Sequence, residues 1–244
     1  MSVMSVVSVI YDTLPGSYFS IQDVQGDNAC FYRSLANQLY FNSQFKKARI
    51  IYSKNNRIGR KSLDEVMNSI LWGYNGKEQT KLAQLLQQAA RKVLYKNRDK
   101  IVTQLDIKVS DFVSMTHELH DMRKYFLGWE DIDIYNEIYK TFASETIYLK
   151  TDKGLKSIQE RWGGAPEQWA LSHFLKMPIT VYHLQHKNTR TGDIEQGRMR
   201  NMKPTKKSYF KLYQTFGQEY KDTGPTLNIM FKGSHYMTLY ENDN

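Results

Sequence analysis

The sequence predicts a mixed α/β (α+β) fold, because its hydrophobic pattern changes twice along the chain. The first 24 residues are rich in valine, isoleucine and serine, which is typical of extended chain. Residues 62–145 place apolar side chains three and four positions apart, which predicts helices. The last third returns to short alternating segments around one helix. Strands near both ends and helices between them define the class.

The first elements in chain order are a strand and a short helix. The opening segment, MSVMSVVSVIYDTLPG, suits a strand and shows neither a basic leader nor a small-residue cleavage site. No apolar run in the chain is long enough to cross a bilayer. Over residues 29–40, Leu35, Ala36 and Leu39 recur at helical spacing. Cys30, the only cysteine, therefore opens a predicted helix.

Four further helices are expected in the middle of the chain. The first begins at the capping box Ser62-Leu63-Asp64-Glu65, in which the serine accepts from first-turn amides and the glutamate reaches back. The other three carry the apolar faces Leu82, Leu85, Leu86, Ala89 and Val93; Phe112, Leu119, Met122 and Phe126; and Tyr135, Ile138, Tyr139 and Phe142. We expect a single domain, 1–244, with a helical lobe, 44–150, whose apolar faces form core.

The last third carries one helix and three strands. Trp162-Gly163-Gly164 predicts a turn, and Pro166 suits the first position of a helix that runs toward Pro178. Segments 179–182, 227–231 and 236–240 alternate as strands do, and a turn at 232–234 makes the last two an antiparallel hairpin with His235 at its corner. The polar, basic stretch 187–207 predicts an exposed loop.

Composition restricts the setting of the protein. One cysteine in 244 residues cannot form an intramolecular disulfide, which favours a reducing cytosol over an oxidising compartment. The formal charge of +9 raises a nucleic-acid hypothesis. Basic and acidic residues are nevertheless interspersed, with Lys-Lys pairs only at 46–47 and 206–207, which favours an ordinary solvated basic surface.

The position of the thiol suggests catalysis. A helix N-terminus favours the thiolate form, the nucleophilic form of cysteine, and free amides of the turn at 27–29 can hold an oxyanion. The alternative is that Cys30 is a small buried hydrophobic residue. A thiol nucleophile needs a base, usually histidine. The pairs in HELH and HLQH lack further ligands for a metal, whereas the hairpin corner can aim His235 into a cleft.

Three segments resemble the ovarian-tumour (OTU) family of cysteine proteases. GDNACFYRSLANQLY is similar to the cysteine-loop motif, an Asp-Gly-x-Cys turn followed by aromatic residues and arginine. WGGAPEQWALSHFLKMPITVY resembles the second block, a Trp-Gly-Gly turn, a helix and a strand. NIMFKGSHYMTLY resembles the third, a strand, a turn and His-Tyr. The blocks follow the family order over about a third of the chain. The helical insertion is similar to that of OTU-like bacterial effectors.

The resemblance implies a papain-like fold, a small central β-sheet flanked by helices with an inserted helical lobe. It implies a deubiquitinase that hydrolyses the isopeptide bond after the ubiquitin Gly-Gly through a Cys30 acyl-enzyme, with His235 as base and neither cofactor nor metal. Tyr236 and Trp162 would contact substrate, and amides of Asp27, Asn28 and Ala29 would form the oxyanion hole. The partners implied are ubiquitin and polyubiquitin chains, with no nucleic acid and no membrane span. We expect a monomer in the cytoplasm, or one secreted by a bacterium into the host cytosol.

Two departures from the family pattern leave alternatives open. Asn28 stands where the family has glycine, and asparagine tolerates positive φ. Met237 stands where many members carry the acceptor that orients the histidine. Asp23, about seven residues before the cysteine as in the effector-like branch, is the expected triad member, Asp27 is its rival, and a dyad without carboxylate is a third possibility. The missing acceptor also keeps a catalytically idle ubiquitin-binding module open.

Overall fold

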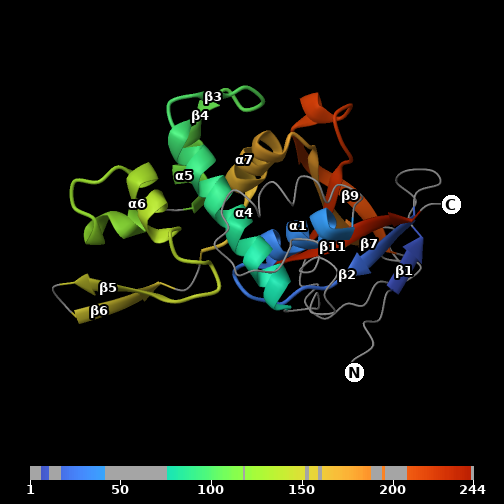
Figure 1. Cartoon of the computed structure of the whole chain (residues 1–244), viewed down its shortest axis with the longest axis horizontal. Coiled ribbons are helices and arrows are strands. Elements are labelled where there is room, and N and C mark those ends of the chain that lie inside the picture. Colours follow the sequence, from blue (N-terminus) through green and yellow to red (C-terminus); the bar gives the residue numbers. More distant parts are fainter. Residues whose placement is uncertain are drawn as a thin grey trace, which may run out of the picture.

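The computed structural model describes residues 7–10, 18–41, 76–117, 119–151, 154–158, 161–187, 194–195 and 208–242. These form a mixed fold of one larger sheet, two short hairpins and a group of helices, so the expected α+β class is confirmed (Figure 1). The capping-box helix predicted at 62–71 lies outside the described residues. Within the described part, no helix combines the length and apolar character needed to span a membrane.

The larger sheet joins strands from both ends of the chain. Its order is β1-β2-β11-β10-β7-β8, and β9 also pairs with β7. The pair β10–β7 is parallel, and the other pairs are antiparallel. The strand bounds are Val7–Ile10 (β1), Tyr18–Gln22 (β2), Ile179–Lys187 (β7), Ile194–Glu195 (β8), Ser208–Phe216 (β9), Leu227–Lys232 (β10) and His235–Asn242 (β11). Because β2 pairs with β11, the segment before Cys30 lies beside the strand that begins at His235.

Three helices build the core against this sheet. Helix α1 (Cys30–Phe41) packs on β10 and β11, and α7 (Ala165–Leu175) packs on β7 and β9. Helix α4 (Lys77–Lys96) lies across α1 and α7, as Figure 1 shows. Every side chain from position 30 to 39 is buried, including polar ones that bond inward, such as Asn37 with Gln79 (Nε2 to Oδ1, 2.7 Å). A helix buried on all sides fixes the position of its first residue.

The predicted lobe contains helices, but also strands and breaks that the periodicity did not indicate. Residues 112–126 were expected to form one helix, yet α5 (Val109–His117) ends and a 3₁₀ segment, η1 (Leu119–Tyr125), follows. The last predicted helix, α6 (Asp131–Ile138), ends before Tyr139 and Phe142. Two hairpins, β3–β4 (Ile101–Val102, Ile107–Lys108) and β5–β6 (Ile147–Thr151, Gly154–Ile158), lie within or border the lobe. The predicted helices were too long because the residues after each helix end are also apolar and pack in the core. Their spacing therefore continued the helical pattern although the helix had ended.

The last third follows the prediction except around residues 187–207. Helix α7 begins one residue before Pro166, and β10 and β11 form the expected antiparallel hairpin. Strand β7 runs to Lys187, five residues beyond the predicted strand, and a short strand, β8, lies within the predicted loop. Strand β9 was not predicted, although apolar and polar residues alternate along part of it. The remainder of the predicted loop lies outside the described residues.

Candidate active site

Cys30 is the first residue of α1 and is almost completely buried, with 1% of its surface exposed. The loop before it is fixed by Asp27, whose Oδ1 accepts from the Ala29 amide at 3.1 Å. The same carboxylate receives Nε and Nη2 of Arg33, at 3.1 and 2.9 Å to Oδ2. Arg33 is itself buried one turn into the helix. This ion pair, of buried Arg33 and half-buried Asp27, ties the loop to the helix that carries the thiol.

His235 is placed by a tight hairpin. Lys232 and His235 are paired directly, so only Gly233 and Ser234 connect β10 to β11. Gly233 has φ +69°, a backbone conformation that glycine adopts without strain. A two-residue loop with glycine first matches the twist of the flanking strands. The imidazole therefore stands at the very start of β11, facing the end of β2.

The structure brings the thiol, the imidazole and one carboxylate together. Nε2 of His235 lies 2.7 Å from Oδ1 of Asp23. The amide of the next residue, Tyr236, donates to Sγ of Cys30 at 3.4 Å, which places the thiol beside the start of β11. Partial burial lowers the pKa of His235, but the hydrogen bond with Asp23 and the interaction with Cys30 outweigh it and raise that pKa to about 9. The imidazole is thus held in its protonated form at neutral pH.

The two aspartates predicted as rivals occupy different positions. Asp23 follows β2 and faces His235, whereas both carboxylate oxygens of Asp27 face Arg33. Met237, two residues after the histidine, pairs with Met230 across the hairpin. Strand β11 pairs with β10 on one side and with β2 on the other. The acceptor for the imidazole is Asp23, which directly follows β2.

Two of the three amides expected to hold an oxyanion are bonded within the loop. Asp27 N donates to the Gln25 carbonyl at 2.9 Å, and Ala29 N donates to the Asp27 side chain at 3.1 Å. Asn28 does not have positive φ, so the turn does not use the left-handed backbone that asparagine tolerates. The turn closes instead through Asp27, which does not require a left-handed residue at Asn28. The oxyanion role of these amides stays a prediction.

Phe31 contacts both Tyr236 and the turn that contains Trp162, the two residues expected to contact substrate. The ring of Tyr236 meets that of Phe31 edge to face at 5.2 Å, and burial, followed by the nearby Cys30, raises the pKa of its phenol. The turn containing Trp162 reaches the same ring through Gly163, since a Cβ at Gly163 would lie 2.4 Å from Cδ1 of Phe31. Only glycine permits this approach of the turn to the residue after the thiol.

A buried carboxylate that the sequence analysis missed holds this turn in place. Glu167 is fully buried, and its Oε2 accepts from the Gly164 amide at 2.8 Å. Its Oε1 contacts Nε2 of His117 at 2.9 Å and the hydroxyl of Tyr135 at 2.6 Å. Burial raises the pKa of Glu167, but His117 and the three hydrogen bonds outweigh it and lower that pKa. The sequence did contain a signal for this role. Glu167 stands three residues after Gly164, the position of the glutamate in a capping box.

Replacing Glu167 with alanine is expected to destabilise the protein by about 3 kcal/mol, because three partners, one of them the buried Tyr135, lose their acceptor. Its folded-state pKa is lowered, so the stabilisation is present above the unfolded value of about 4.3 and is lost as pH falls through the folded value. Urea denaturation at pH 7 and at decreasing pH measures both effects.

The matched control is Glu130→Ala, which removes an exposed glutamate from the same region. That change should alter the free energy of unfolding by about 0.5 kcal/mol or less. Equal losses in the two variants, or a Glu167 effect that does not diminish in acid, would contradict the account of the buried network.

His117 and His173, both on helices, have structural partners. Both ring nitrogens of His117 are engaged, one by Glu167 and the other by the hydroxyl of Tyr139 at 3.1 Å. His173 lies against the ring of Trp169, with centroids 4.5 Å apart. Within the described ranges, no group of three or more histidine, cysteine, aspartate or glutamate side chains is arranged to hold a metal ion.

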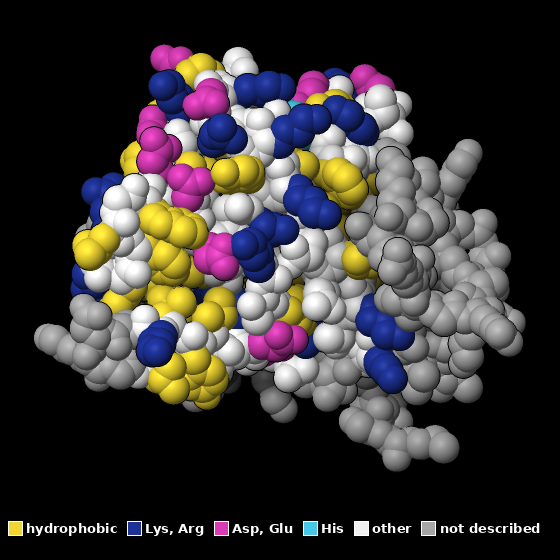
Figure 2. All heavy atoms as spheres, turned by 60° about the vertical axis from the view of Figure 1, so that its left-hand side comes forward, with side chains coloured by type: hydrophobic (Ala, Val, Ile, Leu, Met, Phe, Trp, Pro, Cys, Tyr) yellow, Lys and Arg dark blue, Asp and Glu magenta, His cyan; other side chains and the backbone are white. Residues whose placement is uncertain are grey.

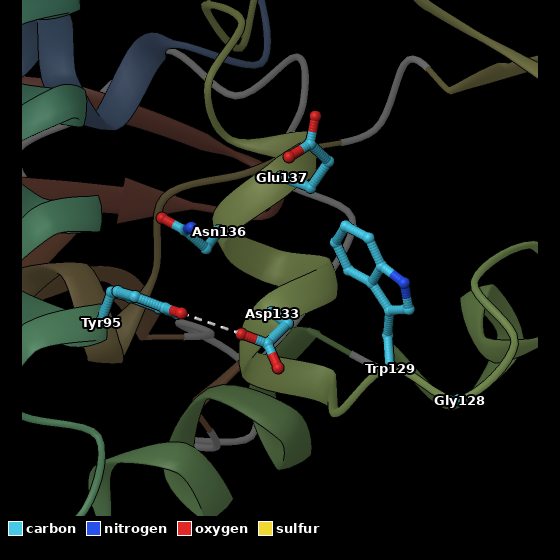
Figure 3. Close-up of a pocket in the computed structure, with 6 residues that line it drawn as sticks. All are labelled: Tyr95, Gly128, Trp129, Asp133, Asn136 and Glu137. Carbon is cyan, nitrogen blue, oxygen red and sulfur yellow. Dashed lines mark hydrogen bonds between the residues drawn. The ribbon is translucent and has the colours of Figure 1, made fainter.

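A pocket of about 370 Å³ lies in the lobe, away from Cys30. Figure 3 shows its lining side chains: Tyr95 from α4, Gly128 and Trp129 from the loop before α6, and Asp133, Asn136 and Glu137 from α6. The hydroxyl of Tyr95 donates to Oδ1 of Asp133 at 3.1 Å. An indole beside two carboxylates suits a cationic group, not the chemistry of a thiol.

No family model matches the chain, and no curated protein matches it by sequence. Three solved structures are similar to it. One is an OTU domain in complex with ubiquitin, at 15% identity and a TM-score of 0.40, with 99% of this chain and 80% of that chain covered. A viral OTU domain protease from Farallon virus has 13% identity, a TM-score of 0.42 and coverage of 98% and 99%. An OTU deubiquitinase from Wolbachia pipientis wMel has 14% identity and a TM-score of 0.39, with 91% of this chain and 88% of that chain covered. TM-scores near 0.4 assign no family, so the proposal below rests on the site.

Proposed function

We propose that this protein is an OTU-type deubiquitinase, a cysteine protease that hydrolyses the isopeptide bond after the C-terminal Gly-Gly of ubiquitin. The observation that carries the proposal is that His235 bonds to Asp23 while the adjacent Tyr236 amide donates to Cys30, across more than 200 positions of sequence. A thiol, a base and an acceptor for the base are the parts that nucleophilic thiol catalysis requires.

The proposed reaction has two halves. The proton of the Cys30 thiol passes to His235, and the thiolate attacks the carbonyl carbon of the last glycine. The imidazolium gives this proton to the lysine amine as the carbon–nitrogen bond breaks, and a thioester with Cys30 remains. In the second half neutral His235 takes a proton from water, the hydroxide attacks the thioester, the carboxylic acid leaves and loses its proton to solvent, and the thiolate and the imidazolium are restored. Asp23 holds the imidazole in the orientation that both transfers need.

The idle ubiquitin-binding alternative depended on Met237, which offers no acceptor to His235. Asp23 at 2.7 Å supplies one, which supports the enzyme over the idle module. The bacterial effector-like origin, delivery to a host cell and the monomeric state remain predictions.

Incubation with the panel of ubiquitin dimers of each linkage, followed on gels, tests the function. We expect at least one linkage to be converted to single ubiquitin. Absence of cleavage of every dimer and of linear ubiquitin by the folded protein would count against the proposal.

The lobe is the proposed docking surface for ubiquitin. Several large apolar side chains in and beside it are exposed: Met115, Leu127, Trp129, Tyr148 and Leu155, the most exposed being Leu127 at 85%. Figure 2 shows hydrophobic patches with both acidic and basic side chains between them on the face that brings the lobe forward. Exposed apolar patches of this kind mark protein interaction sites, and the carboxylates of Asp133 and Glu137 beside Trp129 suit a basic side chain of the partner.

Replacing Leu127 with serine is expected to raise KM for ubiquitin dimers several-fold with little change in kcat, because only binding is lost. The control is Leu212→Ser, since Leu212 is also exposed but lies on β9, outside the lobe. Steady-state cleavage kinetics measure both. An unchanged KM in the Leu127 variant would count against docking on the lobe.

A further inference from the structure

The thiol and the imidazole are carried by two elements that pack on each other. Cys30 begins α1 and His235 begins β11, and the helix lies against the strand (Figure 1). The first contact between them is close to the thiol, where the rings of Phe31 and Tyr236 meet at 5.2 Å. The position of α1 along and across β11 therefore decides how far the sulfur lies from the imidazole.

A buried hydroxyl joins the two elements one helical turn farther on. Thr238 is fully buried, and its Oγ1 donates to the carbonyl of Ser34 and accepts from Nδ2 of Asn37, both at 3.3 Å. Valine has nearly the same shape as threonine, so packing alone does not require a hydroxyl at this position. A buried hydroxyl is tolerated when it is hydrogen-bonded, as here. Nε2 of Gln38 also donates to the carbonyl of Leu239, farther from the thiol.

Thr238 also lies beside the end of β2. It is paired with Gln22, the last residue of that strand, and Asp23 follows directly. Oδ1 of Asp23 is the atom that lies 2.7 Å from Nε2 of His235. Thr238 is thus placed where the segments that carry the thiol, the imidazole and the carboxylate meet.

Buried side chains continue from Thr238 to the loop before the thiol. Nε2 of Gln79, in the first turn of α4, donates to Oδ1 of Asn37 at 2.7 Å. Oε1 of Gln79 accepts from Nη1 of Arg33 at 3.4 Å, and the other nitrogens of Arg33 hold Asp27. Asn37, Gln79 and Arg33 are each at most 3% exposed. We call Thr238, Asn37, Gln79, Arg33 and Asp27 the Thr238 network. Bonded networks of this kind make a core rigid.

We propose that Thr238 is a positioning residue, whose hydroxyl, through the Thr238 network, fixes the helix that carries Cys30 relative to the strand that carries His235. The inference rests on the proposed function. Thr238 is buried under α1 and acts only through the position of the reacting groups. Its loss should therefore slow the chemical step and leave substrate binding in place, because small displacements of reacting groups reduce the rate strongly.

The test compares Thr238→Val and Thr238→Ser with a matched control, Thr180→Val. Thr180 is also a buried strand residue, and its Oγ1 lies 3.0 Å from that of Thr215, between β7 and β9. The substrate is ubiquitin joined through its C-terminus to aminomethylcoumarin. We expect Thr238→Val to lower kcat roughly tenfold with KM within about twofold. Thr238→Ser, which keeps the hydroxyl, should retain about half of kcat or more, and Thr180→Val should leave kcat unchanged.

A second measurement does not involve ubiquitin. It is the rate of alkylation of Cys30 by iodoacetamide at pH 7 divided by the rate at pH 10. At pH 7 a neighbouring imidazolium favours the reactive thiolate, whereas at pH 10 a thiol ionises without such a partner. The ratio should fall several-fold in Thr238→Val and stay the same in Thr180→Val. A loss of stability alone would not change the ratio in the folded protein.

A second pair of variants decides the question if Thr238→Val shows no cooperative unfolding transition. Gln79→Ala removes the link between Asn37 and Arg33. Gln87→Ala removes an equally buried glutamine of α4 that bonds to the carbonyls of Tyr139 and Thr141. Gln79→Ala should lower kcat and the alkylation ratio, and Gln87→Ala should lower neither.

The outcomes separate the two proposals. An unchanged kcat and an unchanged alkylation ratio in folded Thr238→Val would overturn the positioning role. Equal losses in Thr180→Val, or in both glutamine variants, would also overturn it, because they show a general effect of buried polar groups. If the wild type releases no coumarin, the proposed function fails, and the alkylation ratio alone decides whether Thr238 sets the geometry of the thiol and the imidazole.

Discussion

Replacing Cys30 with alanine is expected to abolish cleavage of ubiquitin dimers, because no other side chain beside His235 can form the thioester. The variant should remain folded. The substitution removes a single sulfur atom from the start of α1, and the loop before it is held by Asp27 and Arg33, not by the thiol. Gel assays with the most rapidly cleaved dimer measure activity, and thermal unfolding measures the fold.

Retained cleavage by this variant would refute the assignment of the nucleophile. Loss of cleavage with loss of the unfolding transition would instead assign Cys30 a structural role, as a small buried hydrophobic residue. Cys30→Ser separates these readings further, since it keeps the size of the side chain and offers only a weak nucleophile.

Replacing Asp23 with asparagine is expected to lower kcat/KM on the order of 100-fold. In the pH profile of kcat/KM, the alkaline limb, where activity falls at high pH, should shift to lower pH. Burial lowers the pKa of His235, and the bonds with Asp23 and Cys30 raise it to about 9. Removing the charge of Asp23 must lower that pKa. The imidazolium then loses, at a lower pH, the proton that the leaving amine needs. The pH profile of ubiquitin-aminomethylcoumarin hydrolysis measures the shift.

Asp27→Asn is the matched control, because it makes the same chemical change three residues before Cys30 but at a residue that faces Arg33. It should reduce stability and leave the alkaline limb in place. A shift of the limb in Asp27→Asn but not in Asp23→Asn would make Asp27 the partner of the histidine. No shift in either variant would favour a Cys30–His235 dyad.

The positions of the thiol and the imidazole could be predicted because each depends on local signals. A glycine-bearing turn before apolar residues at helical spacing marks the start of α1, and Gly233 between two alternating segments marks the hairpin that ends at His235. That the thiol and the imidazole lie close together was expected only from the resemblance, because no local pattern shows which strands pair. In the sheet, the pairing of β11 with both β10 and β2 produces it.

What could not be predicted depends on contacts between distant segments. Glu167 is a first-turn helix residue in the sequence, and its bond to His117 exists only because α5 packs on α7. The breaks after His117 and Ile138 were hidden because the residues that follow still face the core. A bulge in the pairing of β7 with β9 stacks Tyr213 on His183, and composition does not reveal that register.

The most direct measurement of the central claim is labelling by ubiquitin that carries a thiol-reactive group at its C-terminus, followed by peptide mapping. The account predicts one covalent adduct, on Cys30, formed by the folded wild type and slowed strongly in His235→Ala. Absence of the adduct while iodoacetamide still reaches Cys30, or an adduct formed equally fast without His235, would contradict a cysteine activated by this histidine for ubiquitin.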